Sequence, residues 1–146
     1  MIDKLLIIDD DPLSIRICEL VIKNSNFAKE IVALTNGKEG VDYFSSYFDR
    51  KKKGGGVETA PDMIFLDLNM PIMDGWEFLD NYIRKYSDRL PKTKIAILSS
   101  SINPSDFIKA QQYDVVIEFV HKPLVAKVMQ ELKEHEQVKE YFAPTN

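Results

Sequence analysis

The chain of 146 residues is 45% hydrophobic and 29% charged, which is typical of one globular domain with an ordinary core. Its formal net charge is −4 and no long basic stripe occurs, which argues against a nucleic-acid-binding protein. No apolar run is long enough to span a bilayer and the start lacks the basic region of a signal peptide, so we expect a cytoplasmic protein.

Strands and helices alternate along the chain. Short apolar runs between turn residues are typical of buried strands, and apolar residues three and four apart are typical of helices. The expected strands cover 5–8, 31–34, 63–67, 95–98 and 115–119. The expected helices cover 12–24, 37–48, 75–83, 104–113 and 124–139. This alternation predicts an α/β fold with a five-stranded parallel sheet and helices on both faces.

Several residues next to these elements have structural rather than chemical explanations. Asp11 precedes Pro12, a pair that favours a helix N-cap over a metal ligand. Asp74 and Gly75 form a turn and cap before the third helix. The single cysteine, Cys18, cannot form an internal disulfide and lies on an apolar helix face, which predicts an inert core thiol.

One segment departs from the alternation. Residues 49–61 have no periodicity and combine four consecutive basic residues with three glycines. We interpret this segment as a mobile surface loop, and the alternative is a basic docking loop for an acidic partner. The rest of the chain reads as a single domain over 1–146, with a core of about 3–140 and a tail, 141–146, that we expect to fray.

Polar side chains follow four of the five expected strands. The carboxyl ends of parallel strands meet at one edge of a sheet, where ligand sites lie in such folds. The residues at that edge are Asp9 and Asp10 after the first strand, Asp67 at the third, Ser99 after the fourth and Lys122 after the fifth. Three carboxylates held together repel one another unless a hard cation joins them. All-oxygen ligation selects magnesium, manganese or calcium over zinc, and we expect Mg²⁺.

This set of side chains suits phosphoryl chemistry. Mg²⁺ prefers one or two carboxylates plus a phosphate oxygen, which leaves one carboxylate free to attack phosphorus. The Lys122 ammonium and the Ser99 hydroxyl would bind the remaining phosphoryl oxygens. The set is therefore chemically complete for accepting a phosphoryl group.

The same residues resemble the receiver domain of two-component response regulators. Receivers carry an acidic pair after strand one, a phospho-accepting aspartate after strand three, a Thr or Ser after strand four and a Lys-Pro after strand five. Here the matching segments are Asp9-Asp10, the stretch from Asp67 to Gly75 that contains Met70-Pro71, then Ser99, then Lys122-Pro123. The resemblance covers nearly the whole chain and implies a flavodoxin-like, doubly wound (βα)5 fold with strand order 2-1-3-4-5.

The resemblance assigns roles at the acidic edge. It implies that Asp67 is the phosphorylation site. It also implies that Asp10, Asp67 and the backbone carbonyl of Asn69 ligate Mg²⁺, with Asp9 acting through metal-bound water. Asn69 and Ser101, each two positions beyond a key residue, would tune the lifetime of the phosphoryl group.

Further roles are carried over to the last two strands. Ser99, in place of the commoner threonine, would bond the new phosphoryl oxygen, and Lys122 would pair with it. The Lys122–Pro123 bond would be cis, as in the family. Phe119, three residues before the lysine, would be the aromatic switch, working with Ser99. It has no hydroxyl, so its switching would depend on packing alone.

The resemblance implies a stand-alone response regulator receiver, monomeric, without an output enzyme of its own. Its phosphodonor would be a sensor histidine kinase or a histidine phosphotransfer protein. Its target would be a protein that contacts the fourth helix (104–113), the fifth strand and the fifth helix (124–139). The only chemistry expected is weak self-phosphorylation and autodephosphorylation.

Two alternatives are kept. One is a degenerate receiver that binds partners without phosphorylation. The other is a phosphatase of the haloacid dehalogenase type, since Asp9 to Asp11 supply an Asp-x-Asp after the first strand. Leu13 stands where that family has Thr or Val, and no acidic pair follows Lys122 to complete its metal site.

Overall fold

The structure, a computed structural model, describes residues 1–54, 56 and 58–144. The strands are β1 (Ile2–Ile8), β2 (Ala28–Leu34), β3 (Met63–Leu66), β4 (Lys94–Ser99) and β5 (Val116–His121). The α-helices are α1 (Pro12–Asn24), α2 (Gly37–Lys52), α3 (Gly75–Lys85), α4 (Pro104–Ala110) and α5 (Ala126–Glu134). Short 3₁₀ helices, η1 (Ser87–Arg89) and η2 (Lys139–Phe142), complete the described elements.

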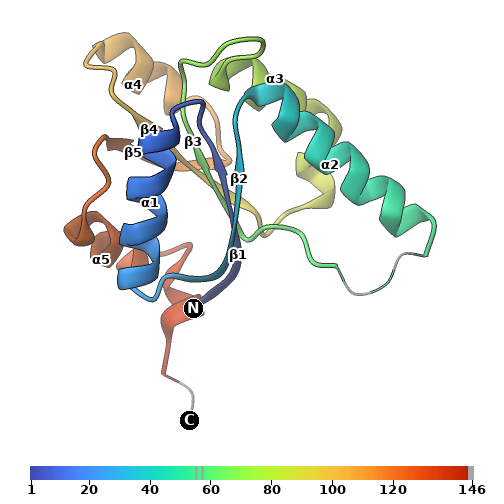
Figure 1. Cartoon of the computed structure of the whole chain (residues 1–146), viewed down its shortest axis with the longest axis horizontal. Helices are drawn as coiled ribbons and strands as arrows, with labels where there is room; N and C mark the ends of the chain where they lie inside the picture. Colours follow the sequence, from blue (N-terminus) through green and yellow to red (C-terminus); the bar gives the residue numbers. More distant parts are fainter. Residues whose placement is uncertain (55, 57, 145–146) are drawn as a thin grey trace.

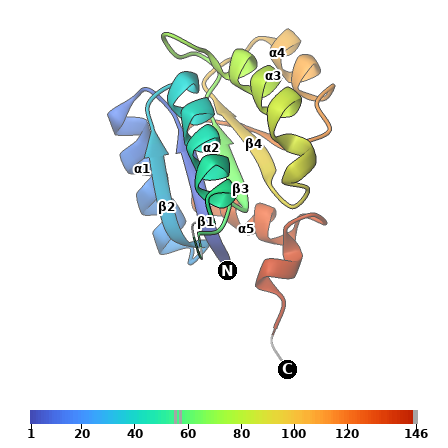
Figure 2. The ribbon, with the colours of Figure 1, turned by 90° about the vertical axis from the view of Figure 1, so that its right-hand side faces the viewer.

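Within the described residues, the five strands form one parallel sheet in the order β2-β1-β3-β4-β5, as the sequence predicted (Figure 1). Helices α1 and α5 cover one face of the sheet, and α2, α3 and α4 lie on the other, as Figures 1 and 2 show. The α/β, flavodoxin-like architecture is therefore confirmed. No helix among the described residues is long and apolar enough to cross a membrane.

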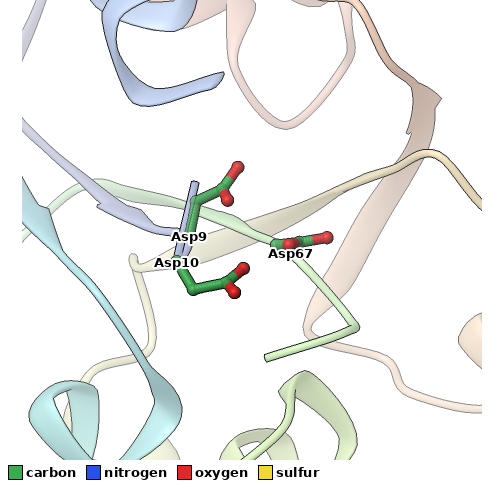
Figure 3. Close-up of side chains that lie close together, drawn as sticks. All are labelled: Asp9, Asp10 and Asp67. Atoms are coloured by element: carbon green, nitrogen blue, oxygen red, sulfur yellow. The ribbon is translucent and has the colours of Figure 1, made fainter. Parts of the chain in front are cut away.

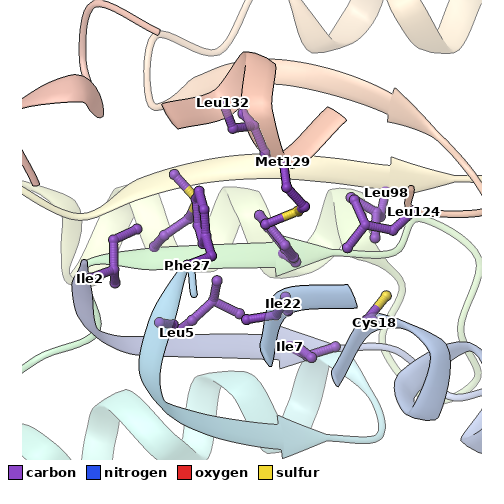
Figure 4. Packing of buried hydrophobic residues seen from close by; sticks show 14 of the residues in the cluster. Ile2, Leu5, Ile7, Cys18, Ile22, Phe27, Leu98, Leu124, Met129 and Leu132 are labelled. Carbon is purple, nitrogen blue, oxygen red and sulfur yellow. The ribbon is translucent and has the colours of Figure 1, made fainter. Parts of the chain in front are cut away.

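Two apolar cores flank the sheet because side chains alternate along each strand. In β1, Leu5 and Ile7 point into the core under α1 and α5, which also holds Ile22 and Met129 (Figure 4). Alternate residues of β1 and β3 pack instead against the aromatic residues of α2 and α3, Phe44, Phe78 and Tyr82. Strands β1 and β3 are thus buried on both faces. The polar residues that follow them lie at one edge of the sheet, outside the two cores.

Capping residues fix where the helices start, as predicted. The Asp11 side chain accepts a hydrogen bond from the amide of Leu13 at the start of α1. Asp74 forms a capping box with Glu77 at the start of α3. Gly75 is required there, because a Cβ at this position would lie 2.3 Å from the carbonyl oxygen of Asp67. The start of α3 therefore packs directly against the backbone at the end of β3.

The segment 49–61, expected to be a loop, is partly helical in the structure. Helix α2 continues to Lys52, since no glycine or proline lies between Phe48 and Lys52 and its last turn carries three cations that suit a helix C-terminus. The side chain of Arg50 then makes a bidentate ion pair with Glu58, at 2.6 and 2.8 Å. Gly55 and Val57, which belong to the expected mobile loop, lie outside the described residues.

The C-terminal segment is also more structured than the sequence suggested. Helix α5 ends at Glu134, five residues early, and the chain turns so that Val138 is buried in the core. The Phe142 ring then packs 5.1 Å from that of Phe27, and the Tyr141 carbonyl accepts a hydrogen bond from the Met1 amino group. Residues 141 and 142 therefore belong to the packed fold, and 145 and 146 lie outside the described residues.

The expected strand and helix faces were also correct in the main. Strand β2 begins at Ala28, three residues before its expected start. Ile83, near the C-terminal end of α3, is exposed. Cys18 is buried as predicted, and burial raises the pKa of its thiol to about 11.

Candidate functional site

The structure brings the three predicted carboxylates together. Asp9 and Asp10 follow β1 and Asp67 follows β3, the neighbouring strand. One carboxylate oxygen from each of these residues lies within 4.8 Å of the others (Figure 3). Oxygen ligands at this separation suit a hard divalent cation such as Mg²⁺.

Asp9 is the most constrained of the three carboxylates. It is 2% exposed. One oxygen, Oδ1, accepts a hydrogen bond from the amide of Asp11 at 3.0 Å. The other, Oδ2, accepts from the Ser14 hydroxyl and from the Lys122 ammonium, both at 2.7 Å. Ser14 is a residue that the sequence reasoning missed. The one available signal was its place in the first turn of a helix that starts beside an acidic strand end.

Lys122 links two of the carboxylates. Its Nζ atom lies 2.7 Å from Asp9 Oδ2 and 3.5 Å from Asp67 Oδ2. Burial by itself would lower the pKa of this ammonium, but the hydrogen bond to Asp9 and the charge of Asp67 raise it above the usual value. The Lys122–Pro123 peptide bond is cis, as the resemblance implied. Lys122 is therefore a permanent cation inside the acidic site.

Asp67 is buried, and its surroundings disfavour the charged form of its side chain. Its Oδ1 accepts a hydrogen bond from the amide of Leu68 at 2.9 Å. Burial raises the pKa of Asp67 to about 6; Lys122 opposes this rise and the negative charge of Asp9 adds to it. A bound cation would relieve the same repulsion, so the charge on Asp67 and the binding of a metal are linked.

Ser99 and Lys122 are adjacent at the edge of the sheet. The amide of Lys122 donates to the Ser99 carbonyl at 2.9 Å, which aligns the ends of β4 and β5. The Ser99 side chain is fully buried, and its hydroxyl oxygen accepts from the amide of Ser101 at 3.0 Å. Asn69 lies exposed in the loop after β3, and its role as a carbonyl ligand stays a prediction.

Phe119 lies on β5 against the fourth helix. Its half-buried ring is 5.8 Å from that of Phe107 on α4 and 5.5 Å from that of His121. Together with Ala110 and Glu118, these phenylalanines line a small groove of about 120 Å³. A movement of the Phe119 ring would therefore change its packing against α4. Its role as a switch stays a prediction.

The family model of the response regulator receiver domain matches residues 5–134. The chain belongs to this family. The receiver is 29% identical over 143 residues to the probable methanogenesis regulatory protein FilR2 of Methanothrix harundinacea, which covers 97% of this chain and 84% of that protein. It is 26% identical over 113 residues to the response regulator Rcp1 of Synechocystis, covering 76% of this chain and 71% of Rcp1.

Solved structures agree with the fold of this receiver. The crystal structure of a two-component response regulator from Cytophaga hutchinsonii superposes with a TM-score of 0.79 at 29% identity, covering 91% of this chain and 95% of that one. Receivers are in general phosphoacceptors that bind Mg²⁺ at an acidic pocket, and they take part in two-component signalling. The cluster of Asp9, Asp10 and Asp67 is the acidic pocket of this receiver.

Proposed function

We propose that this receiver accepts a phosphoryl group on Asp67, with Mg²⁺ bound, in a reaction that it catalyses itself. The observation that carries the proposal is the setting of Asp67. Its carboxylate is 6% exposed, lies beside two other carboxylates and is 3.5 Å from the Lys122 ammonium. A carboxylate that is buried, yet next to both a metal site and a cation, is suited to attack phosphorus and to retain the product.

The step forms one bond and breaks one. An Asp67 oxygen attacks the phosphorus, and the bond between phosphorus and the leaving atom of the donor breaks, with its electron pair going to the leaving group. Asp10, Asp67 and the Asn69 carbonyl would hold Mg²⁺, with Asp9 acting through water. When bound, Mg²⁺ neutralises charge on the phosphoryl oxygens and on the pocket. The fit rests on the three clustered carboxylates.

Lys122 and Ser99 would stabilise the phosphorylated state. The Lys122 ammonium, which contacts both Asp9 and Asp67, needs a small shift to pair with a phosphoryl oxygen on Asp67. Ser99 would donate a hydrogen bond from its hydroxyl to another of these oxygens. Ser101, which with Asn69 would set the phosphoryl lifetime, donates a 2.5 Å hydrogen bond from its hydroxyl to Asp106 of α4.

The phosphodonor is a sensor histidine kinase or a histidine phosphotransfer protein in this proposal. Exposed aliphatic side chains follow the ends of β1, β3, β4 and β5, around the acidic pocket. They are Leu13, Ile72, Ile102 and Val125, which are 67%, 76%, 92% and 44% exposed. Such apolar groups around a polar centre are typical of a protein contact surface, so they support a protein as the donor.

The output is phosphorylation-dependent binding of a target protein, through the face formed by α4, β5 and α5. Phe107 and Ile108 of α4 are exposed beside Phe119, which supports this face as the contact surface. In this proposal the receiver is one domain over 1–146, monomeric and cytoplasmic, with weak self-phosphorylation and autodephosphorylation as its only catalysis.

Intact-mass analysis after incubation with acetyl phosphate and Mg²⁺ tests the proposal, with Asp67→Asn as the control. We expect one added phosphoryl group that is absent without Mg²⁺ and absent in the control. A wild-type protein that binds Mg²⁺ but gains no mass would support a phosphorylation-independent receiver instead. Steady phosphate release that survives Asp67→Asn but requires Asp9 would support the phosphatase alternative.

A further inference from the structure

A second recess lies at the end of the molecule opposite the acidic pocket. It is an open groove of about 630 Å³ between the C-terminal end of α2 and the segment that follows α3. Its lining includes Phe48, Asp49, Lys51, Lys52, Tyr86 and Arg89. Helix α2 runs away from the strand ends that carry the acidic pocket, as Figure 1 shows, so the groove is remote from Asp67.

Arg89 is held at the groove by aromatic rings rather than by a carboxylate. The rings of Phe48 and Tyr86 stack at 5.5 Å with an interplanar angle of 8°. The Arg89 guanidinium lies 3.9 Å from the centroid of the Phe48 ring, and one of its N–H groups donates to the Lys85 carbonyl. A guanidinium carries five N–H donors, so most of those of Arg89 remain for a ligand. The cation is thus positioned in advance.

The lining of the groove carries a net positive charge on an acidic protein. Within the described part of the chain, no ion pair includes Lys51, Lys52 or Arg89. With Asp49 as the acidic lining residue, three cations and one anion give a local charge of +2, on a chain of net charge −4.

The dipole of α2 explains part of this charge but leaves Arg89 unexplained. Cations in the last turn of a helix are stabilising, which accounts for Lys51 and Lys52. Arg89 lies beyond the end of α3, in η1, and its guanidinium is ordered by two aromatic residues, Phe48 of α2 and Tyr86 directly after α3. Arg89 is therefore the residue that indicates an anionic ligand.

The aromatic rings indicate which anion the groove suits. Single-stranded nucleic acids bind by stacking bases on free aromatic faces. Here the Phe48 ring is engaged by Arg89 and Tyr86, and the Lys51 ammonium lies 5.7 Å from the centroid of the Tyr47 ring. The rings hold cations, and a guanidinium fork pairs well with a carboxylate. We propose that this groove binds an acidic, extended segment of a partner protein, with Arg89 as the main anchor, independently of phosphorylation at Asp67.

Fluorescence anisotropy with a short fluorescein-labelled peptide of alternating glutamate and serine tests the proposal. We expect the full chain to bind this peptide at low ionic strength. Arg89→Gln should weaken binding about tenfold, since a charge-assisted pair is lost. Arg89→Lys should also weaken it, because the bidentate fork is lost. Asp49→Asn should tighten binding about twofold to fivefold, because a like charge leaves the groove.

Matched variants separate this groove from a general effect of net charge. Lys127 and Asp114 are exposed on other parts of the surface, so Lys127→Gln and Asp114→Asn should leave the affinity unchanged. Asp67→Asn should bind as the wild type does, whatever the outcome of the phosphorylation experiment. The proposal is overturned by no binding, by equal effects of Lys127→Gln and Arg89→Gln, or by tighter binding of an oligothymidylate of equal charge.

Discussion

The Lys122 ammonium and the Asp9 carboxylate form an ion pair at 2.7 Å across 113 positions of the chain. The loops after β1 and β5 supply one partner each, so the pair joins the end of an inner strand to the end of the edge strand β5. With side chains 3% and 18% exposed, Asp9 and Lys122 are screened weakly by solvent. The lysine therefore competes with a metal ion for the same charges.

Replacing Lys122 should reveal this competition. We expect Lys122→Gln to bind Mg²⁺ about threefold to tenfold more tightly, because a cation next to two carboxylates is removed. Isothermal titration calorimetry of the unphosphorylated protein measures the change. Lys127→Gln, which removes an exposed cation elsewhere, is the control and should bind Mg²⁺ as the wild type does. Unchanged or weaker Mg²⁺ binding by Lys122→Gln would contradict the competition.

Asp67→Asn should stabilise the metal-free protein at pH 7. Burial raises the pKa of Asp67 to about 6, so the native state holds this proton more tightly than the unfolded state does. The resulting stability is present below the unfolded pKa of about 4 and is lost as the pH rises through 6. At pH 7 the charged carboxylate therefore costs on the order of 2 kcal/mol, which the amide avoids.

Urea denaturation at several pH values measures this effect. The free energy of unfolding of Asp67→Asn should exceed that of the wild type at pH 7, and the difference should shrink as the pH falls toward 4. Saturating Mg²⁺ should stabilise the wild type and reduce the difference at pH 7. A variant that is less stable than the metal-free wild type at pH 7 would show that the Asp67 carboxylate is not under electrostatic stress.

The acidic pocket was predictable because it follows from topology. In a parallel sheet the strand ends share one edge, so Asp9, Asp10 and Asp67 had to meet once the strands were recognised. Ser14 was not predictable in the same way, since its contact with Asp9 depends on how closely α1 approaches the strand end. The contact of Arg89 with Phe48 joins segments far apart in the sequence, and no local pattern encodes it.

The N-terminal boundaries of the helices were predicted better than the C-terminal boundaries. The starts are set by local capping residues such as Asp11 and Asp74. The end of α5 is set by tertiary packing, because burying Val138 requires the chain to leave the helix after Glu134. Sequence periodicity continued past that point, so the helix was expected to reach residue 139.

Ile72 has a backbone conformation that its side chain disfavours. Its φ of 69° lies in the left-handed region, where a β-branched residue is strained, and it is 76% exposed, so little burial compensates. Ile72→Asn should therefore raise the free energy of unfolding by about 1 kcal/mol, since asparagine tolerates this region. Ile102→Asn is the control: Ile102 is also exposed but has no positive φ, so its change should be close to zero. Thermal and urea unfolding of both variants measure the difference, and equal shifts would mean that hydrophobicity alone is responsible.

Phe119→Ala should separate phosphorylation from its effect on α4. Phe119 makes no contact with Asp67 in the described hydrogen bonds and ion pairs, so the variant should accept a phosphoryl group from acetyl phosphate to the same extent. Its ring packs against Phe107 of α4, so its removal should reduce the response of that helix. Amide chemical shifts of residues 105–110, recorded before and after phosphorylation, measure this response.

The matched control for Phe119→Ala is Ile108→Ala, which shortens an exposed side chain of the same helix without touching the ring pair. We expect the shift changes in α4 to fall at least about twofold in Phe119→Ala and to persist in Ile108→Ala. Phosphorylation by intact mass should be equal in both, because the acidic pocket is unaltered. Full shift changes in a phosphorylated Phe119→Ala protein would exclude the ring as the link between Asp67 and α4, and Ser99 with its hydrogen bond to Ser101 would then be the route left to test.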